Sequence, residues 1–513
     1  MPPKFEMLPL ELLTEIMQWL EVADVLCTRR TCKYIHQATT AKPIWIHLFW
    51  KCERASPGSL TLEKPLTMYS SKELEHVVLS WESSRVGWHT RDGIPSRQRT
   101  LHIPNDCLHD IALSGEHYRH YLVPGGRWLL AFRIDGQISY YDLESAEYEK
   151  GRILVPGYIE KCSAINDVSF SVDISDRLPF RDFKMAQHVH DDHYHGLWPS
   201  YGIIKIWHID FVFEGHAVVG LRANCLKTFI VSLTCNILKL TLSLRNQYLA
   251  IAVEYSVYEC KRNHATIVEW PLLRDMAQEY PRRILYTSLK AEDIHLLPNG
   301  RLAVFTMDSV SVYNVSSIPL GEDNMLFDAH NSDRSYPIPS STCTLSCSGH
   351  SPPSPRIISI PFVSPDSVGF LVGELDALQS VTISSDDFGD PRLTAKKLIQ
   401  LPSHQWCKHW TTRYSLGRHH GVLYRGDHKS ESSLILLEYD PEQGFEPDYV
   451  PVIKSIKRDI QEGKTDQDTS RQLSPLWKFE ELAFDVLFDE ASGRVVVHMD
   501  QRLEVLDFAL MYK

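Results

Sequence analysis

Residues 124–132, with the sequence PGGRWLLAF, join a glycine-rich turn to a strand that is apolar at every position. Glycine readily adopts the positive φ that tight hairpin turns require. A strand that is apolar throughout, rather than at every second residue, is typical of a sheet covered on both faces. This stretch therefore predicts that sheets pack against sheets in the region where it lies.

The same turn recurs twice, which indicates a repeated unit. Residues 298–302 read PNGRL and residues 491–495 read ASGRV, so Gly-Arg precedes an apolar strand at all three places. The three glycines lie 174 and 193 residues apart (300 − 126 and 493 − 300), which is close to three units of about 60 residues in each interval. A residue of a second expected strand follows each glycine 14 to 16 positions later: Asp142, Asn314 and Asp507.

Seven such units are expected in the long C-terminal part of the chain. Comparable strand ends lie between the three turns, near Asp210, Trp270, Thr382 and Tyr439. Radially arranged four-stranded blades, each covered by its neighbours, explain the buried strands and the lack of helical patterns together. Residues 88–513 are therefore predicted to form a β-propeller of seven blades, with six or eight as alternatives. Polar insertions are expected near residues 331–355 and 454–472.

The first ninety residues follow a helical period instead. Leu12, Ile16 and Leu20 recur at every fourth position, so residues 9–20 can form a helix with a wide apolar face. A further helix is expected at residues 71–84, where a serine can cap the first turn. The sequence thus predicts an α+β multidomain protein, with a small all-α N-terminal domain followed by an all-β propeller.

Composition narrows the classes of partner. The chain of 513 residues has a net charge of −12 and no basic stripe that reverses it, so nucleic acid is not an expected partner. Charged residues interrupt the apolar runs of the first thirty residues, and no uncharged run approaches the roughly 18 residues that cross a bilayer. The 11 cysteines lack paired CxxC spacing, as expected for free thiols. We therefore expect a soluble protein of the cytoplasm or nucleus, with no membrane partner.

A series of anchor residues occurs in a fixed order along residues 5–49. The anchors are Leu8-Pro9, Glu11-Leu12-Leu13, Ile16, Leu20, Asp24-Val25-Leu26, Arg29, Thr31-Cys32-Lys33 and Trp45. In this order they resemble the F-box, a short helical domain that would cover less than a tenth of the chain. Thr28 stands where that family often has Leu, and Ile35 where it often has Trp. Residues 50–87 resemble the helical connector of fungal F-box proteins that continue into a propeller-like region.

The resemblance implies binding to the Skp adaptor and, through it, to a cullin. The residues assigned to adaptor binding are Leu8, Pro9, Leu12, Leu13, Ile16, Leu20, Val25, Leu26, Cys32 and Trp45. The residues themselves point the same way, because some forty residues of short helix are expected to bury this apolar set only in part. The chain would then be the non-catalytic substrate-recognition subunit of a Skp–cullin–F-box ubiquitin ligase, without a cofactor, and the propeller would bind an unknown target protein.

Three other interpretations remain open. The N-terminal helices could be an ordinary cap on the propeller, or the chain could be an adaptor-binding scaffold outside a ligase. The third is a metal-binding propeller protein, because residues 188–195 contain His188, His190, His193 and His195 beside two aspartates. Imidazole and carboxylate groups are common zinc ligands. The segment is polar and reads as a solvated loop, so we assign no metal site to it.

Overall fold

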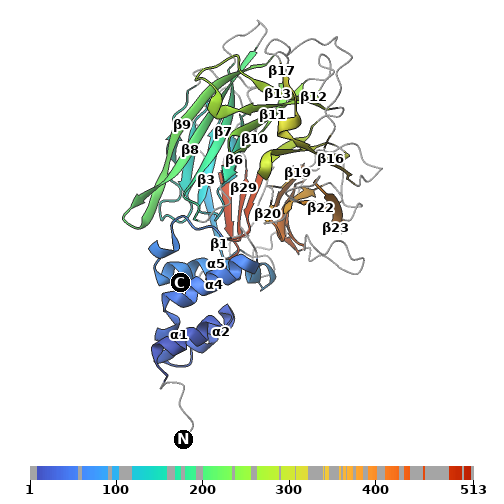
Figure 1. Ribbon diagram of the computed structural model, residues 1–513. Helices are drawn as coiled ribbons and strands as arrows, with labels where there is room; N and C mark the ends of the chain where they lie inside the picture. Colours follow the sequence, from blue (N-terminus) through green and yellow to red (C-terminus); the bar gives the residue numbers. More distant parts are fainter. Residues whose placement is uncertain are drawn as a thin grey trace, which may run out of the picture.

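The computed structural model has a helical N-terminal part followed by β-sheets, and the helices lie at one end of the sheet domain (Figure 1). Within the described residues, no helix has the length and apolar character needed to cross a bilayer. The structure describes residues 8–55, 60–90, 95–102, 118–158, 168–174, 179–191, 200–233, 237–255, 263–287, 291–306, 308–321, 339, 341–345, 357–359, 362–364, 367–373, 377–384, 391–400, 411–426, 432–439, 454–456, 485–499 and 502–509.

The helical part contains five α-helices and one short 3-10 helix in the described range. They are α1 (Leu10–Gln18), α2 (Val22–Arg29), α3 (Lys33–Thr39), α4 (Lys42–Ala55), η2 (Leu66–Met68) and α5 (Ser71–Thr90). Pro9 precedes α1 as its N-cap residue, where a missing N–H costs no hydrogen bond. Helix α5 starts where the sequence predicts but continues to Thr90, beyond the expected end at residue 84 and the expected start of the propeller at residue 88.

The described residues that follow form seven antiparallel sheets, each of which is one blade. Blade 1 has β2 (Tyr118–Leu122), β3 (Trp128–Arg133), β4 (Ile138–Asp142) and β5 (Arg152–Val155). Blade 2 has β6 (Val168–Ile174), β7 (Asp182–Asp191), β8 (Ser200–Glu214) and β9 (Ala217–Leu233). Blade 3 has β10 (Ile237–Arg245), β11 (Tyr248–Tyr255), β12 (Asn263–Glu269), β13 (Arg282–Thr287) and β17 (Leu320–Gly321).

The other four blades complete the set. Blade 4 has β14 (Asp293–Leu297), β15 (Arg301–Phe305), β16 (Ser309–Asn314) and β18 (Ser341–Thr344). Blade 5 has β19 (Ile357–Ile358), β20 (Phe362–Ser364), β21 (Ser367–Gly373), β22 (Ala377–Ser384) and β23 (Leu393–Gln400). Blade 6 has β24 (Thr411–Leu416), β25 (His420–Gly426), β26 (Ser432–Glu438) and β27 (Lys454–Ile456). Blade 7 has β28 (Asp485–Asp489), β29 (Arg494–His498), β30 (Arg502–Asp507) and β1 (Arg97–His102).

Neighbouring blades share hydrophobic cores all the way around. Each of seven apolar clusters joins one blade to the next around the ring, and the last of them joins blade 7 back to blade 1. In that seventh cluster Leu129 of β3 packs with Val496 of β29 and Leu503 of β30. Strands β3 and β29 are therefore buried on both faces, as their apolar sequences predict. The seven-bladed propeller is confirmed, as is the order of an all-α part followed by an all-β part.

The three Gly-Arg turns have the predicted backbone. Their glycines have φ values of 70°, 67° and 61° in chain order. The strand after each turn pairs with the expected second strand, and the cross-strand partners are Trp128 with Asp142, Arg301 with Asn314, and Arg494 with Asp507.

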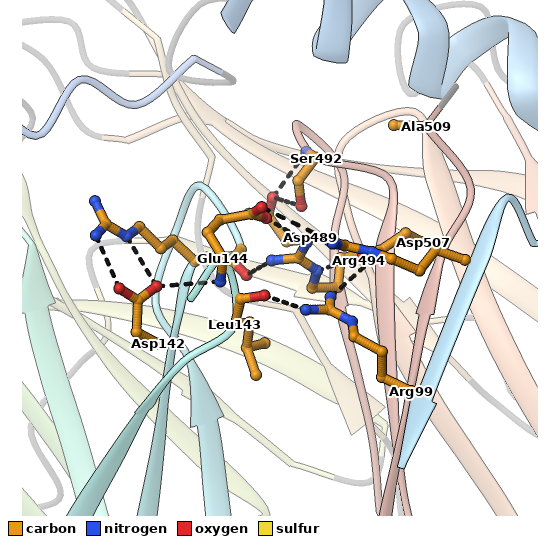
Figure 2. Close-up of polar contacts among 12 residues, drawn as sticks. Arg99, Asp142, Leu143, Glu144, Asp489, Ser492, Arg494, Asp507 and Ala509 are labelled. Atoms are coloured by element: carbon orange, nitrogen blue, oxygen red, sulfur yellow. Dashed lines mark hydrogen bonds and ion pairs between the residues drawn. The ribbon is translucent and has the colours of Figure 1, made fainter. Parts of the chain in front are cut away.

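The ring closes where the first strand enters the last blade. Strand β1 pairs with β30, and Arg97 lies opposite Asp507. Figure 2 shows Arg494 and Arg99 converging on the Asp507 carboxylate, at 2.5 and 2.8 Å, while Arg494 also reaches Glu144 of blade 1 at 2.5 Å. Burial would raise the pKa of Asp507, but these guanidinium groups outweigh it and hold the pKa below its ordinary value.

Two predicted loops contain strands. Ser341–Thr344 is the outer strand of blade 4 and Lys454–Ile456 is the outer strand of blade 6, although both lie in segments expected to be polar insertions. An outer strand faces solvent and can be polar, so composition alone did not reveal it. Most of residues 331–355 and 457–472 lies outside the described residues.

Candidate protein-interaction site

The helices share a single hydrophobic core. Trp45 of α4 is fully buried, with Leu74 and Val78 of α5 in the same cluster. The Trp45 indole N–H donates to the Thr39 carbonyl at 2.9 Å, and the Arg29 guanidinium lies 5.4 Å from the centre of the Trp45 ring. Because α5 supplies part of this core, the connector completes the packing of the four preceding helices.

One face of α1 is left uncovered by this core. Leu12, Ile16 and Trp19 have relative exposures of 47%, 39% and 83%, and Pro9 is also exposed. Positions 9, 12, 16 and 19 are spaced by three or four residues, so they lie along one side of the helix axis. We call these four residues the α1 stripe. Helix α1 lies farther from the propeller than α5, so the stripe belongs to the part of the molecule remote from the sheets (Figure 1).

Aromatic side chains extend this surface onto α4. The Trp19 ring centroid lies 6.4 Å from that of His47, and Trp50, one turn further along α4, is 40% exposed. Phe49, between them in sequence, is fully buried and packs edge-on against Trp50. Exposed tryptophan is rare on a surface without a partner and is enriched at the centre of protein interfaces.

The ten residues assigned to adaptor binding fall into three groups. Pro9, Leu12 and Ile16 are exposed. Four more are partly exposed: Leu8, Leu20, Leu26 and Cys32. Three are fully buried in this chain: Leu13, Val25 and Trp45.

Val25 and Trp45, both assigned to adaptor binding, are buried by the chain itself. The connector covers them, because Leu60, Leu62 and α5 belong to the same cluster. Buried residues can support the exposed face but have no surface to offer a partner in this conformation. Trp19 was missed by the sequence reading, although its spacing of seven residues from Leu12 places it on the same helix face.

Comparison with protein families agrees with the helical geometry. Residues 5–47 match the family model described as F-box domain. This chain carries an F-box domain. The match ends two residues before the boundary expected at residue 49, and α1 to α3 lie within it. The F-box is followed by the seven-bladed propeller.

Comparison with solved structures gives distant matches to propellers. The "Myceliophteria_thermophila Cps50 (Swd1) beta-propeller domain" is 12% identical with a TM-score of 0.43, over 79% of this chain and 99% of the other. The WD40 domain of SCAP from fission yeast is 10% identical with a TM-score of 0.36, over 80% of this chain and 98% of the other. No curated protein matches the sequence.

The histidine-rich segment 188–195 does not form a described metal site. His188 on β7 is buried, whereas residues 192–199 lie outside the described residues. Among the described residues, one group of donor atoms lies close enough to hold a cation: Asp182, His208 and Asp210, within 4.8 Å of one another. The Asp210 carboxylate is 3.5 Å from Arg222, and each ring nitrogen of His208 faces a different aspartate. The Asp210 carboxylate thus already has an arginine partner within the protein, and nothing further points to a bound cation among these described residues.

Proposed function

We propose that this protein is the substrate-recognition subunit of a Skp–cullin–F-box ubiquitin ligase. F-box domains generally bind Skp-type adaptors, and the match covers the helices that carry the α1 stripe. The observation that carries the proposal is the stripe itself, since the helical core is complete and still leaves Leu12, Ile16 and Trp19 in water. Helices that present residues at such spacing commonly dock in an apolar groove of a partner.

The proposed mechanism is tethering rather than chemistry by this chain. The adaptor would hold the α1 stripe, and the propeller would hold a target protein. A target lysine would then meet activated ubiquitin at a high effective concentration, so the rate of transfer rises without any residue of this chain touching the reacting bond. The end of the propeller away from the helices is the natural surface for the target, because loops on a rigid scaffold commonly carry recognition (Figure 1).

The adaptor interaction is tested by comparing two apolar surfaces of the same chain. The test variant combines Leu12→Asp, Ile16→Asp and Trp19→Asp, and the matched control is Leu272→Asp on the propeller, where Leu272 is 75% exposed. We expect the adaptor to co-purify with the wild type and the control but not with the triple variant. Unchanged adaptor binding by a folded triple variant would contradict the proposal.

Pull-down of the cullin separates the ligase from a scaffold. The ligase assignment predicts that the cullin co-purifies with the wild-type chain and adaptor, and that both are lost together in the triple variant. Adaptor without cullin would support the scaffold instead. We also propose that the protein acts in the cytoplasm or nucleus, and the five free cysteines among the described residues support this proposal.

A further inference from the structure

The segment between α4 and α5 connects the F-box to two blades of the propeller. Its Leu62 carbonyl accepts a hydrogen bond from the backbone N–H of Phe180, just before β7 in blade 2, at 2.7 Å. Leu60 and Leu62 themselves are buried in the helical core. The segment thus belongs to the helices through its apolar side chains and to the propeller through its backbone.

Glu63 fixes this segment to blade 1. Its carboxylate accepts hydrogen bonds from the Arg127 guanidinium at 2.8 Å and from the Trp128 indole N–H at 2.6 Å. Arg127 is held in turn by Asp142 at 2.9 Å and by the Val218 carbonyl at 2.8 Å. The Gly-Arg turn of blade 1 therefore supplies a receptor for a carboxylate of the connector.

Lys64 fixes the same segment to blade 2. Its ammonium group donates to Glu73 of α5 at 2.6 Å and to the His216 carbonyl at 2.9 Å, and lies 4.6 Å from the Tyr69 ring centre. The residue is only 5% exposed. His216 is at the tip of the hairpin formed by β8 and β9, the two longest strands in the described range, which reaches down to the helices (Figure 1).

Directed hydrogen bonds to charged groups hold the two parts of this junction in register. The buried Lys64 ammonium and the Glu63 carboxylate, whose side chain is 21% exposed, lose free energy when these bonds are broken. Glu63 and Lys64 are adjacent in sequence but reach two different blades, so rotation of the F-box in any direction would break at least one set of bonds. The hydroxyl of Ser84 on α5 donates mainly to the Trp81 carbonyl at 2.8 Å and also lies 3.3 Å from the Glu490 carbonyl of blade 7.

We propose that Glu63 and Lys64 are positioning residues that lock the F-box at one orientation to the propeller and so determine which lysines ubiquitin can reach. This inference rests on the proposed ligase function. A fixed orientation keeps the acceptor lysines within a limited zone, because misplacement by an ångström or so can lower a transfer rate strongly. Loosening the junction would widen that zone and slow transfer at each site.

The orientation is measured directly by pulsed electron spin resonance between spin labels. Exposed Cys27 on α2 and exposed Cys225 on β9 are the labelling sites, with the remaining cysteines replaced. The test variant is Glu63→Leu with Lys64→Met, which keeps side-chain volume but removes the directed bonds. We expect a single narrow distance distribution for the wild type and a broader one for the double variant. Glu63→Gln in an otherwise wild-type chain keeps an acceptor for the Trp128 indole N–H, so its distance distribution should stay narrow.

Lysine choice is the second readout. The chain is assembled with adaptor, cullin and its RING subunit, and is supplied with ubiquitin, ATP and the ubiquitin-activating and ubiquitin-conjugating enzymes. The ubiquitin attached to its own lysines is then mapped by mass spectrometry. We expect more sites in the double variant, each modified about tenfold more slowly than in the wild type, with adaptor affinity unchanged. The control is Glu147→Gln, which breaks an exposed ion pair with Lys150 away from the junction, keeps every lysine and should change neither readout.

The outcomes are separable. If either readout is unchanged in a double variant that melts cooperatively, the proposal is overturned. If that variant does not fold, Lys64→Met alone is tested against the same criteria. If the wild-type chain receives no ubiquitin, the proposed ligase function fails, and the distance distribution alone decides whether Glu63 and Lys64 lock the junction.

Discussion

The ring closure buries its apolar side chains within the chain, whereas the F-box leaves some of its apolar side chains exposed. At the closure, Leu129 of blade 1 meets Val496 and Leu503 of blade 7, and the cluster is complete within the chain. In the F-box, a complete core still leaves Leu12 and Trp19 exposed on the far side of α1. In a closed ring every blade packs against a neighbour on both of its faces. A helix at the edge of a small bundle packs against the core on one side only, and its other side stays exposed. The exposed face of α1 is therefore the surface expected to bind a partner.

Asp507→Ala should have the largest effect on the free energy of unfolding, because it removes the most buried carboxylate at the ring closure. Asp507 is 2% exposed and pairs with Arg494 and Arg99, which would remain buried without their carboxylate. We expect a loss of about 4 kcal/mol in the free energy of unfolding. Urea unfolding measures it. Asp210→Ala is the control, because the ion pair between Asp210 and Arg222 is longer, at 3.5 Å, and accessible to solvent. Equal losses for the two variants would contradict the account.

Acid should open the same closure through two buried histidines. His120 of β2 and His498 of β29 have ring centroids 4.5 Å apart, and burial lowers the pKa of both, that of His498 to about 4. A lowered histidine pKa means that the folded state resists protonation, so its stability falls as pH drops below the unfolded value of about 6.5. For His498 the loss reaches about 3 kcal/mol between pH 7 and pH 4.

The test compares unfolding free energies of the wild type and His498→Leu across that pH range. The difference between the two proteins removes the contributions of partly buried carboxyls such as Glu63 and Asp489, whose pKa values desolvation raises. We expect the wild type to lose more stability on acidification than the variant. Parallel pH profiles would show that His498 does not titrate as described.

Trp19→Ala tests whether the exposed face of α1 binds the adaptor. Trp19 is 83% exposed, so its removal should change the free energy of unfolding by less than about 0.5 kcal/mol. Adaptor affinity should fall by about 2 kcal/mol, or about thirtyfold in Kd, if the side chain is an anchor of the interface. Calorimetric titration with purified adaptor measures it. A large loss of stability with unchanged affinity would reverse the assignment of this face.

The smallest expected effect is the difference in stability between alanine substitutions in two of the Gly-Arg turns. Gly300 and Gly493 have nearly the same positive φ, 67° and 61°. An added methyl group meets nothing within 4 Å at Gly300, but at Gly493 it would lie 2.7 Å from the Cβ of Ser84 on α5. Gly300→Ala should cost about 1 kcal/mol from backbone conformation alone. Gly493→Ala should cost more, and thermal melting that shows equal costs would mean that α5 is not packed tightly on blade 7.

Much of the fold could be predicted from the sequence where the signal is local. The period of Leu12, Ile16 and Leu20 fixes a helix, and the Gly-Arg turns fix hairpins that recur at blade spacing. The entry of β1 into blade 7 has no local signal, because its partner β30 is about 400 residues away along the chain. Outer strands such as Ser341–Thr344 can have polar sequences like those of loops, because their outer edge faces water.

The candidate site was predicted in part. Order and spacing identified the F-box and three residues of the α1 stripe, Pro9, Leu12 and Ile16. Burial could not be read in the same way, because Val25 and Trp45 are covered by α5, which the F-box pattern does not include. Glu63 and Lys64 gave no signal at all, since their partners come from blades 1 and 2 and their role exists only in the folded molecule.

Hydroxyl-radical footprinting of the wild-type chain with and without the Skp adaptor tests the central claim most directly. Trp19 and Leu272 are the two most exposed large apolar residues among those described, one on the F-box and one on the propeller. The account predicts that adaptor strongly protects Trp19 from oxidation and leaves Leu272 unchanged. Equal oxidation of Trp19 with and without saturating adaptor would contradict it.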